Sequence, residues 1–164
     1  MTKEQYERWS APFRKNAIRI KLLKEIDKWI TGAVFLAYPA LLAYLFLQGN
    51  FRQMCFSLGI PGGSFLVVSL FRSIYSAPRP YEVIEITPLI LKETKGKSFP
   101  SRHVFSAFII GMTFLPVLKP IGVLILAAGT VMAFIRVIGG VHFPKDTAAG
   151  ALFGILCGML YVFL

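Results

Sequence analysis

The sequence predicts an all-α fold: a multi-pass transmembrane helical bundle of about five crossings, with an amphipathic N-terminal helix at the membrane interface. The first observation behind this prediction is composition, because 55% of the 164 residues are hydrophobic and only 16% are charged. A soluble domain carries roughly 25% charged residues, so this composition argues against a soluble globular protein. The second observation is a set of five charge-free runs that are long enough, or nearly long enough, to cross a bilayer.

The first 28 residues differ in kind from the rest of the chain. They hold eight basic and four acidic residues, and their apolar residues recur at roughly helical spacing. A basic amphipathic helix lying on the membrane surface fits this pattern, and a solvated leader helix that docks on the bundle is the alternative. We therefore expect a basic amphipathic segment over residues 1–28, followed by a transmembrane domain over residues 29–164.

The charge-free runs follow one another along that domain. Runs 29–51, 53–71 and 147–164 contain 23, 19 and 18 residues, and runs 104–118 and 120–135 contain 15 and 16. A bilayer core of about 30 Å needs about 20 helical residues, so the two middle runs cross only if the charges beside them sit at the membrane boundary. Lys119-Pro120 separates these two runs and predicts a tight hairpin. Residues 76–99 form the longest connection, interpreted as a plain loop or as a lid over a site.

The topology gathers most of the remaining ionisable residues at one membrane boundary. The hairpin leaves one face of the membrane at His103 and returns to the same face at Arg136, while flanking helices end or begin there. Ionisable groups within membrane segments are costly, which favours a functional interpretation. The gathered residues are Arg72, Arg79, Arg102, His103, Arg136, His142 and Asp146.

This set of side chains suits phosphate chemistry. Arginines hold a phosphate through forked, charge-assisted hydrogen bonds. One histidine is able to attack phosphorus while the other protonates the departing oxygen. A carboxylate beside the attacking histidine fixes its tautomer and stabilises the imidazolium. The alternative is that the arginines face lipid phosphates and the histidines only cap helices.

Three sequence blocks, in order and at fixed spacing, carry a family resemblance. They are Arg72 followed after six residues by Arg79-Pro80, then Pro100-Ser101-Arg102-His103, then Arg136 followed by His142 and Asp146 as R-x5-H-x3-D. The blocks closely resemble the signature of the type 2 phosphatidic acid phosphatase superfamily, which is K-x6-R-P, P-S-G-H and S-R-x5-H-x3-D. The resemblance covers roughly residues 50–164 and implies an integral-membrane lipid phosphatase.

The resemblance also implies a role for each residue of the three blocks. His142 would attack phosphorus and form a phosphohistidine, Asp146 would orient it, and His103 would protonate the leaving lipid oxygen. Phosphate would be held by Arg72, Arg79, Ser101 and Arg136, and the position of Arg102 makes it a further candidate contact.

Three positions depart from the family pattern. Arg72 replaces a lysine, Arg102 replaces the glycine of P-S-G-H, and Ile135 replaces a serine. None of these changes removes a catalytic group, but they leave open which phosphate ester fits best. The candidates are phosphatidic acid, phosphatidylglycerol phosphate and a polyprenyl phosphate or pyrophosphate.

The sequence predicts neither a cofactor nor a metal. A two-metal phosphatase needs several clustered carboxylates, and Asp146 is the only acidic residue after Glu93. The net charge of +10 accompanies long apolar runs, so the expected partners are a lipid phosphate substrate and the bilayer, with no nucleic acid. Two alternatives remain: a non-catalytic membrane protein that binds anionic lipid, and an enzyme like the vanadate-dependent haloperoxidases, which share the phosphate-site residues.

The charge distribution predicts a multi-pass protein of the cell membrane and favours one side for the site. With five crossings, the N-terminal segment and the site share a side that holds sixteen Lys and Arg residues, against Arg52 and Lys119 on the other. The positive-inside rule then favours the cytoplasmic face. A sixth crossing by residues 1–28 would reverse the side.

Overall fold

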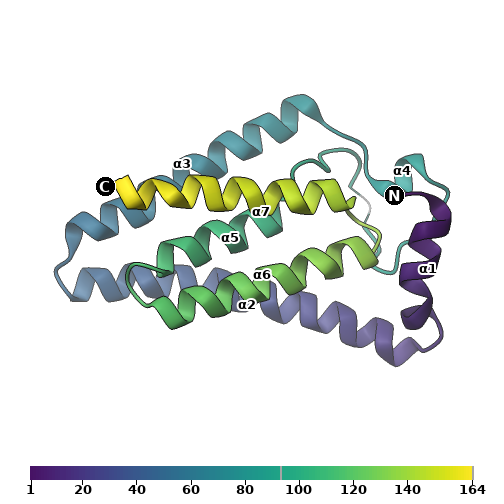
Figure 1. The fold of residues 1–164 in the computed structure, drawn as a ribbon, viewed down its shortest axis with the longest axis horizontal. Coiled ribbons are helices and arrows are strands. Elements are labelled where there is room, and N and C mark those ends of the chain that lie inside the picture. Colours follow the sequence, from purple (N-terminus) through teal and green to yellow (C-terminus); the bar gives the residue numbers. More distant parts are fainter. Residues whose placement is uncertain (93, 164) are drawn as a thin grey trace.

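The computed structural model describes residues 1–92 and 94–163, and every regular element within them is a helix. Figure 1 shows long helices lying side by side with one short helix across an end. The elements are α1 (Lys3–Arg14), α2 (Ala17–Leu47), α3 (Phe51–Tyr75), α4 (Pro80–Val83), α5 (Arg102–Phe114), α6 (Lys119–Ile138), α7 (Pro144–Gly158) and the 3-10 helix η1 (Met159–Phe163). The predicted all-α class is confirmed.

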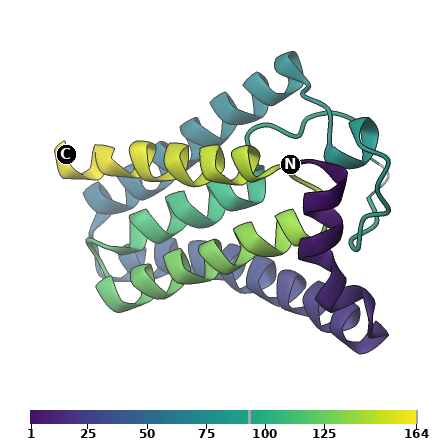
Figure 2. The same cartoon turned by 45° about the vertical axis from the view of Figure 1, so that its right-hand side comes forward.

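Three segments within the described residues are long and apolar enough to cross a membrane: Ala17–Leu47, Phe51–Val83 and Lys119–Ile138. The helices α5 and α7 have 13 and 15 residues, so at about 1.5 Å per residue they are about 20 and 22 Å long. That is shorter than a bilayer core of about 30 Å. Both nevertheless run alongside the longer helices (Figure 2), and the predicted count of about five crossings includes these two short helices.

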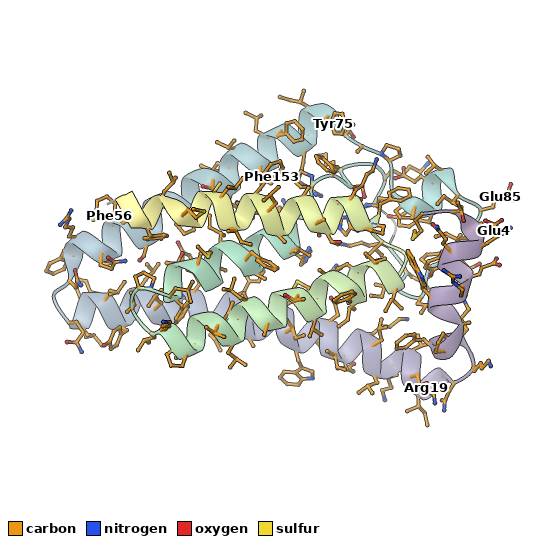
Figure 3. All side chains as sticks on the ribbon, in the orientation of Figure 1. Glu4, Arg19, Phe56, Tyr75, Glu85 and Phe153 are labelled. Carbon is orange, nitrogen blue, oxygen red and sulfur yellow. The ribbon has the colours of Figure 1, made fainter. Side chains whose placement is uncertain are left out.

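The molecule has two distinct ends. One end holds the α2–α3 and α5–α6 connections and the C-terminus, and the other holds α1, the connection from α3 to α5 and the α6–α7 connection (Figure 1). Figure 3 places Glu4 and Glu85 at this second end and Phe56 toward the first. The hairpin expected at Lys119-Pro120 is present, because α6 begins at Lys119 directly after a short turn. The second end is where the predicted site residues meet.

The N-terminal segment forms two helices, where the sequence pattern predicted one amphipathic segment over residues 1–28. Asn16 begins a new helix because its side-chain oxygen accepts a hydrogen bond from Ile18 N–H at 2.8 Å. From there α2 continues without a break through residue 28 into the apolar run. The shorter helix α1 docks on the bundle and buries Tyr6, whose hydroxyl accepts a hydrogen bond from Leu89 N–H at 3.2 Å.

The central helix is α5. Nine of its 13 residues are buried, and it contacts α2, α3, α6 and α7. The outer helices instead point large apolar side chains outward: Leu36 is 72% exposed, Leu66 69% and Leu124 68%. Exposed apolar faces of this extent suit hydrocarbon rather than water.

The helices α7 and α5 approach each other closely along a row of glycines. Gly150, Gly154 and Gly158 recur every four residues, and a Cβ atom at Gly150 would lie 2.6 Å from the carbonyl oxygen of Ser101. Small residues at such an interface let two helix backbones pack together. This packing fixes the start of α7 against the start of α5, where Ser101 N–H donates to the Asp146 carbonyl at 2.8 Å.

Candidate active site

Arg72, in the last turn of α3, holds the segment that leads into α5. Its Nη1 donates to the carbonyl oxygen of Ser98 at 3.2 Å and also to that of Pro100, and its Nη2 donates to the carbonyl of Lys97. The side chain is buried, with 6% of its surface exposed. The sequence predicted a phosphate contact for Arg72, and the structure gives it three backbone carbonyls that shape the loop before His103.

Arg79 joins the same loop to the α6–α7 connection. Its Nε donates to the carbonyl of Gly96 at 3.1 Å and its Nη1 to the carbonyl of Val141, also at 3.1 Å. Pro80 starts the single turn of α4 directly after it, and Glu82 in that turn accepts hydrogen bonds from Arg79 N–H and Gly96 N–H. Arg79 therefore lies where two motif blocks meet.

His142 lies in the α6–α7 connection and faces Asp146 and Ser98. The distance from His142 Nδ1 to Asp146 Oδ2 is 3.6 Å, beyond normal hydrogen-bond length. Ser98 Oγ lies 3.3 Å from the same Nδ1 and donates to Asp146 Oδ2 at 2.5 Å. Phe143 N–H also donates to that carboxylate oxygen, at 3.0 Å. The expected histidine–carboxylate pair therefore includes a serine that the motif does not contain.

The environment of His142 favours its neutral form. Only 1% of the residue is exposed, and this burial lowers the pKa of His142 to about 4, with Asp146 opposing the shift and Arg79 adding to it. A histidine with that pKa is uncharged at pH 7 and keeps a lone pair on one ring nitrogen. Since Nδ1 faces Ser98 and Asp146, the lone pair falls on Nε2, as a nucleophile requires.

Arg136 forms an ion pair across the bundle. Its Nη2 lies 3.0 Å from Oδ2 of Asp27, which lies in the N-terminal half of α2. The two side chains are 5% and 13% exposed. Asp27 belongs to the N-terminal segment, outside the region that the sequence motifs cover, yet it contacts a central residue of the third motif block.

Two motif side chains carry a buried donor without a hydrogen-bond partner among the described residues, and Asp146 carries a buried acceptor, Oδ1, that also lacks one. The two donors are the Oγ of Ser101, which is fully buried at the start of α5, and the Nε of Arg136. Buried polar groups in folded proteins are normally paired, so an unpaired one calls for a specific explanation. Both positions were predicted to contact phosphate, and an anionic ligand would satisfy both donors.

A cavity of about 350 Å³ opens beside these residues. Its lining comes from α3, the 76–99 connection and the start of α5, and consists of Ser69, Arg72, Arg79, Lys92, Thr94, Lys95, Gly96, Lys97, Arg102 and His103. Six of these side chains are basic, and none of the described lining residues is acidic. Such a cavity attracts an anion.

Two basic residues of the lining lie outside the family's phosphate-binding positions: the half-buried Lys92, which the sequence did not predict as a site residue, and the exposed Arg102, which it did. Burial, together with the nearby charges of Arg136 and Arg79, lowers the pKa of Lys92 to about 8. Arg102 lies over the Phe65 ring, with 5.5 Å between its guanidinium carbon and the ring centroid. His103 is within electrostatic range of both, and also of Arg136 and His142.

The structure thus brings all the predicted site residues to one end of the bundle, but in two groups. Arg72, Arg79, Arg102 and His103 line the cavity, whereas Ser101, Arg136, His142 and Asp146 are buried and do not line it. Sequence analysis missed three residues of the site: Asp27, Lys92 and Ser98. Ser98 lies two residues before the second block and Asp27 is the last acid before the first apolar run, but only packing shows what each contacts.

Comparison with known proteins identifies the family. The profile of the PAP2 superfamily matches residues 50–163. Among curated proteins, undecaprenyl-diphosphatase BcrC of Bacillus subtilis is 29% identical over 143 residues, covering 85% of this chain and 74% of that protein. The bacitracin transport permease protein BcrC of Bacillus licheniformis is 34% identical over 91 residues, covering 56% of this chain and 44% of that one.

Two solved structures share the fold. LpxE of Aquifex aeolicus gives a TM-score of 0.76 at 22% identity, covering 99% of this chain and 95% of its own. A transmembrane PAP2-type phosphatidylglycerolphosphate phosphatase of Bacillus subtilis gives 0.71 at 19% identity, covering 98% and 84%. The resemblance inferred from the three motif blocks is confirmed: this chain is a membrane protein that belongs to the PAP2 superfamily of phosphatases.

Proposed function

We propose that this chain removes the terminal phosphate from a lipid diphosphate of the polyprenyl type, through a phosphohistidine formed on His142. The observation that carries the proposal is the buried, neutral His142 beside a cavity whose lining contains six basic side chains. A diphosphate carries more negative charge than a monophosphate, so it balances more of this positive charge. The similarity to undecaprenyl-diphosphatase BcrC supports the same substrate class.

The reaction proceeds in two steps. His142 Nε2 attacks the terminal phosphorus while the bond from phosphorus to the bridging oxygen breaks, and His103, in its imidazolium form, gives a proton to that departing oxygen. Water then attacks the phosphohistidine and gives a proton to His103, which releases inorganic phosphate and restores both histidines. Asp146 stabilises the positive charge on the ring after attack. Ser101 Oγ and Arg136 Nε donate to the transferred phosphoryl group, which satisfies both of these unpaired donors.

Lys92 and Arg102 would bind the second phosphate. Both side chains line the cavity, and neither occupies a position where the family pattern has a phosphate-binding residue. A partly desolvated ammonium or guanidinium binds phosphate more strongly than one in open water. On this assignment the family residues bind the phosphate that is removed, and these two bind the one that stays with the lipid.

Substrate comparison tests the proposal. The purified protein, in detergent with EDTA, would receive a polyprenyl diphosphate, a polyprenyl phosphate, phosphatidic acid and phosphatidylglycerol phosphate. We expect fastest phosphate release from the diphosphate, inhibition by vanadate and no turnover by His142→Ala. Lys92→Met should slow the diphosphate reaction more than the monophosphate reaction, whereas Lys119→Met, at the opposite end of the molecule, should slow neither.

Three results would contradict the proposal. Turnover by His142→Ala would contradict the phosphohistidine intermediate on His142. A strict requirement for added magnesium would contradict a metal-independent mechanism. Equal rates on all four lipids would remove the diphosphate assignment. The alternative of a non-catalytic lipid-binding protein predicts binding of the same lipids with no phosphate released from any of them.

A further inference from the structure

We propose that Ser98 is a positioning residue that links His142 to Asp146, so that the carboxylate orients the nucleophile through a serine hydroxyl. The proposal rests on the phosphohistidine mechanism proposed above and assigns a role to a residue outside the three motif blocks. Its basis is the arrangement of three buried side chains from separate parts of the chain: Ser98 from the loop before α5, His142 from the α6–α7 connection and Asp146 from α7.

The distances decide which group contacts His142. From Nδ1 of the imidazole, Oδ2 of Asp146 lies 3.6 Å away and Oγ of Ser98 lies 3.3 Å away. The serine in turn donates to the carboxylate at 2.5 Å, a length typical of a charge-assisted O–H···O bond. Because the serine proton points at Asp146, its oxygen is left to accept the Nδ1 proton of the imidazole.

This arrangement fixes the tautomer of His142. With its proton on Nδ1, the ring presents an unprotonated Nε2 for attack. No proton is transferred among Ser98, His142 and Asp146 during that step. After attack, the positive charge on the imidazole strengthens the bond to Ser98 and, through it, the interaction with Asp146.

The position of Ser98 is itself tightly held. Its N–H donates to the carbonyl of Ala77 at 2.9 Å, and its own carbonyl accepts from Arg72 Nη1 at 3.2 Å. The residue is completely buried. Arg72 therefore acts on His142 indirectly, because it fixes the backbone that carries the serine hydroxyl. This gives the arginine at the family's lysine position a role apart from charge.

Nitrogen NMR of the imidazoles tests the proposal without using turnover. The chain has only two histidines, so protein labelled with 15N-histidine gives two sets of ring signals, which His103→Gln assigns. We expect a protonated Nδ1 and a bare Nε2 for His142 at pH 7, and a mixture of both tautomers in Ser98→Ala. An unchanged tautomer in Ser98→Ala would overturn the proposal. Since this readout needs no substrate, it separates failure of the serine link from failure of the phosphatase function.

Kinetics provide the second measurement. Outer contacts that orient a metal-binding histidine are typically worth about 10–100-fold in activity, and by analogy we expect a loss of that size in kcat for Ser98→Ala with little change in KM. Ser106→Ala is the matched control, because it also removes a buried hydroxyl near the start of α5 and should leave kcat unchanged. Equal kcat values for the two variants would overturn the proposal.

A third variant covers the case in which the alanine protein does not fold. Ser98→Cys keeps nearly the same shape with a weaker hydrogen-bonding group, so its kcat should lie between those of the wild type and a protein lacking the link. A cysteine variant with wild-type kcat and an unchanged pH profile would overturn the role of the hydroxyl.

Discussion

Replacing Asp27 with asparagine isolates the ion pair that ties α2 to Arg136. Asparagine keeps the size of the side chain and one oxygen acceptor but removes the charge, which leaves the Arg136 guanidinium, 5% exposed, without a counter-charge at 3.0 Å. Breaking a buried ion pair from one side costs about 3–5 kcal/mol. Because Asp27 is 13% exposed, we expect the lower value, about 3 kcal/mol. For a domain of this size that corresponds to about 6–12 °C in melting temperature.

Thermal unfolding of the detergent-solubilised protein measures this effect. Glu25→Gln is the matched control, because it removes the same charge from the same helix two residues away. The double variant Asp27→Asn/Arg136→Gln should melt at a higher temperature than the sum of the single changes predicts, since it leaves no buried charge unpaired. If Asp27→Asn and Glu25→Gln lowered the melting temperature equally, the pair would contribute nothing and the reasoning would be wrong.

Two further predictions concern pH and topology. His142 has a pKa of about 4 in the folded chain, against the ordinary 6.5 in the unfolded chain, so acid favours the unfolded state. The neutral His142 therefore contributes its full stability above about pH 6.5, and this contribution is lost as the pH falls toward 4. Between pH 7 and pH 5 the wild type should lose about 2 kcal/mol relative to His142→Gln, as measured by denaturation, and a constant difference would contradict the lowered pKa. The charge count predicts that Lys95→Cys, in a chain with Cys55 and Cys157 replaced by serine, escapes a membrane-impermeant thiol reagent in intact cells while Lys119→Cys reacts. Labelling of the cysteine at position 95 would place the site on the outer face.

The sequence predicted the features that depend on local pattern. Charge-free runs identified the long helices, Lys119-Pro120 identified the hairpin, and the spacing of the motif blocks identified the family. The join between the N-terminal segment and the first long helix was different. The amphipathic pattern continues across residue 16, and only the capping contact from Asn16 to Ile18 N–H reveals that a new helix begins there.

Contacts between distant parts of the chain could not be read from the sequence. Ser98 and Asp146 are 48 residues apart, and Asp27 reaches Arg136 only because α2 packs against α6. The spacing of Arg72 predicted a positive charge near phosphate. The direction of its guanidinium, toward three backbone carbonyls, depends on how the loop before α5 folds. Motif patterns record residue type and separation, and neither quantity specifies the partner of a buried polar group.

The row of glycines on α7 restricts which parts of the molecule tolerate substitution. Adding even one carbon atom at Gly150 would push the Asp146 end of α7 away from the Ser101 end of α5, so this face accepts almost no mutational drift. The 76–99 connection is not constrained in this way at Thr94 and Lys95, which are exposed at the cavity. Diversification toward new lipid head groups is therefore expected to accumulate in that connection, while the α5–α7 face stays the same.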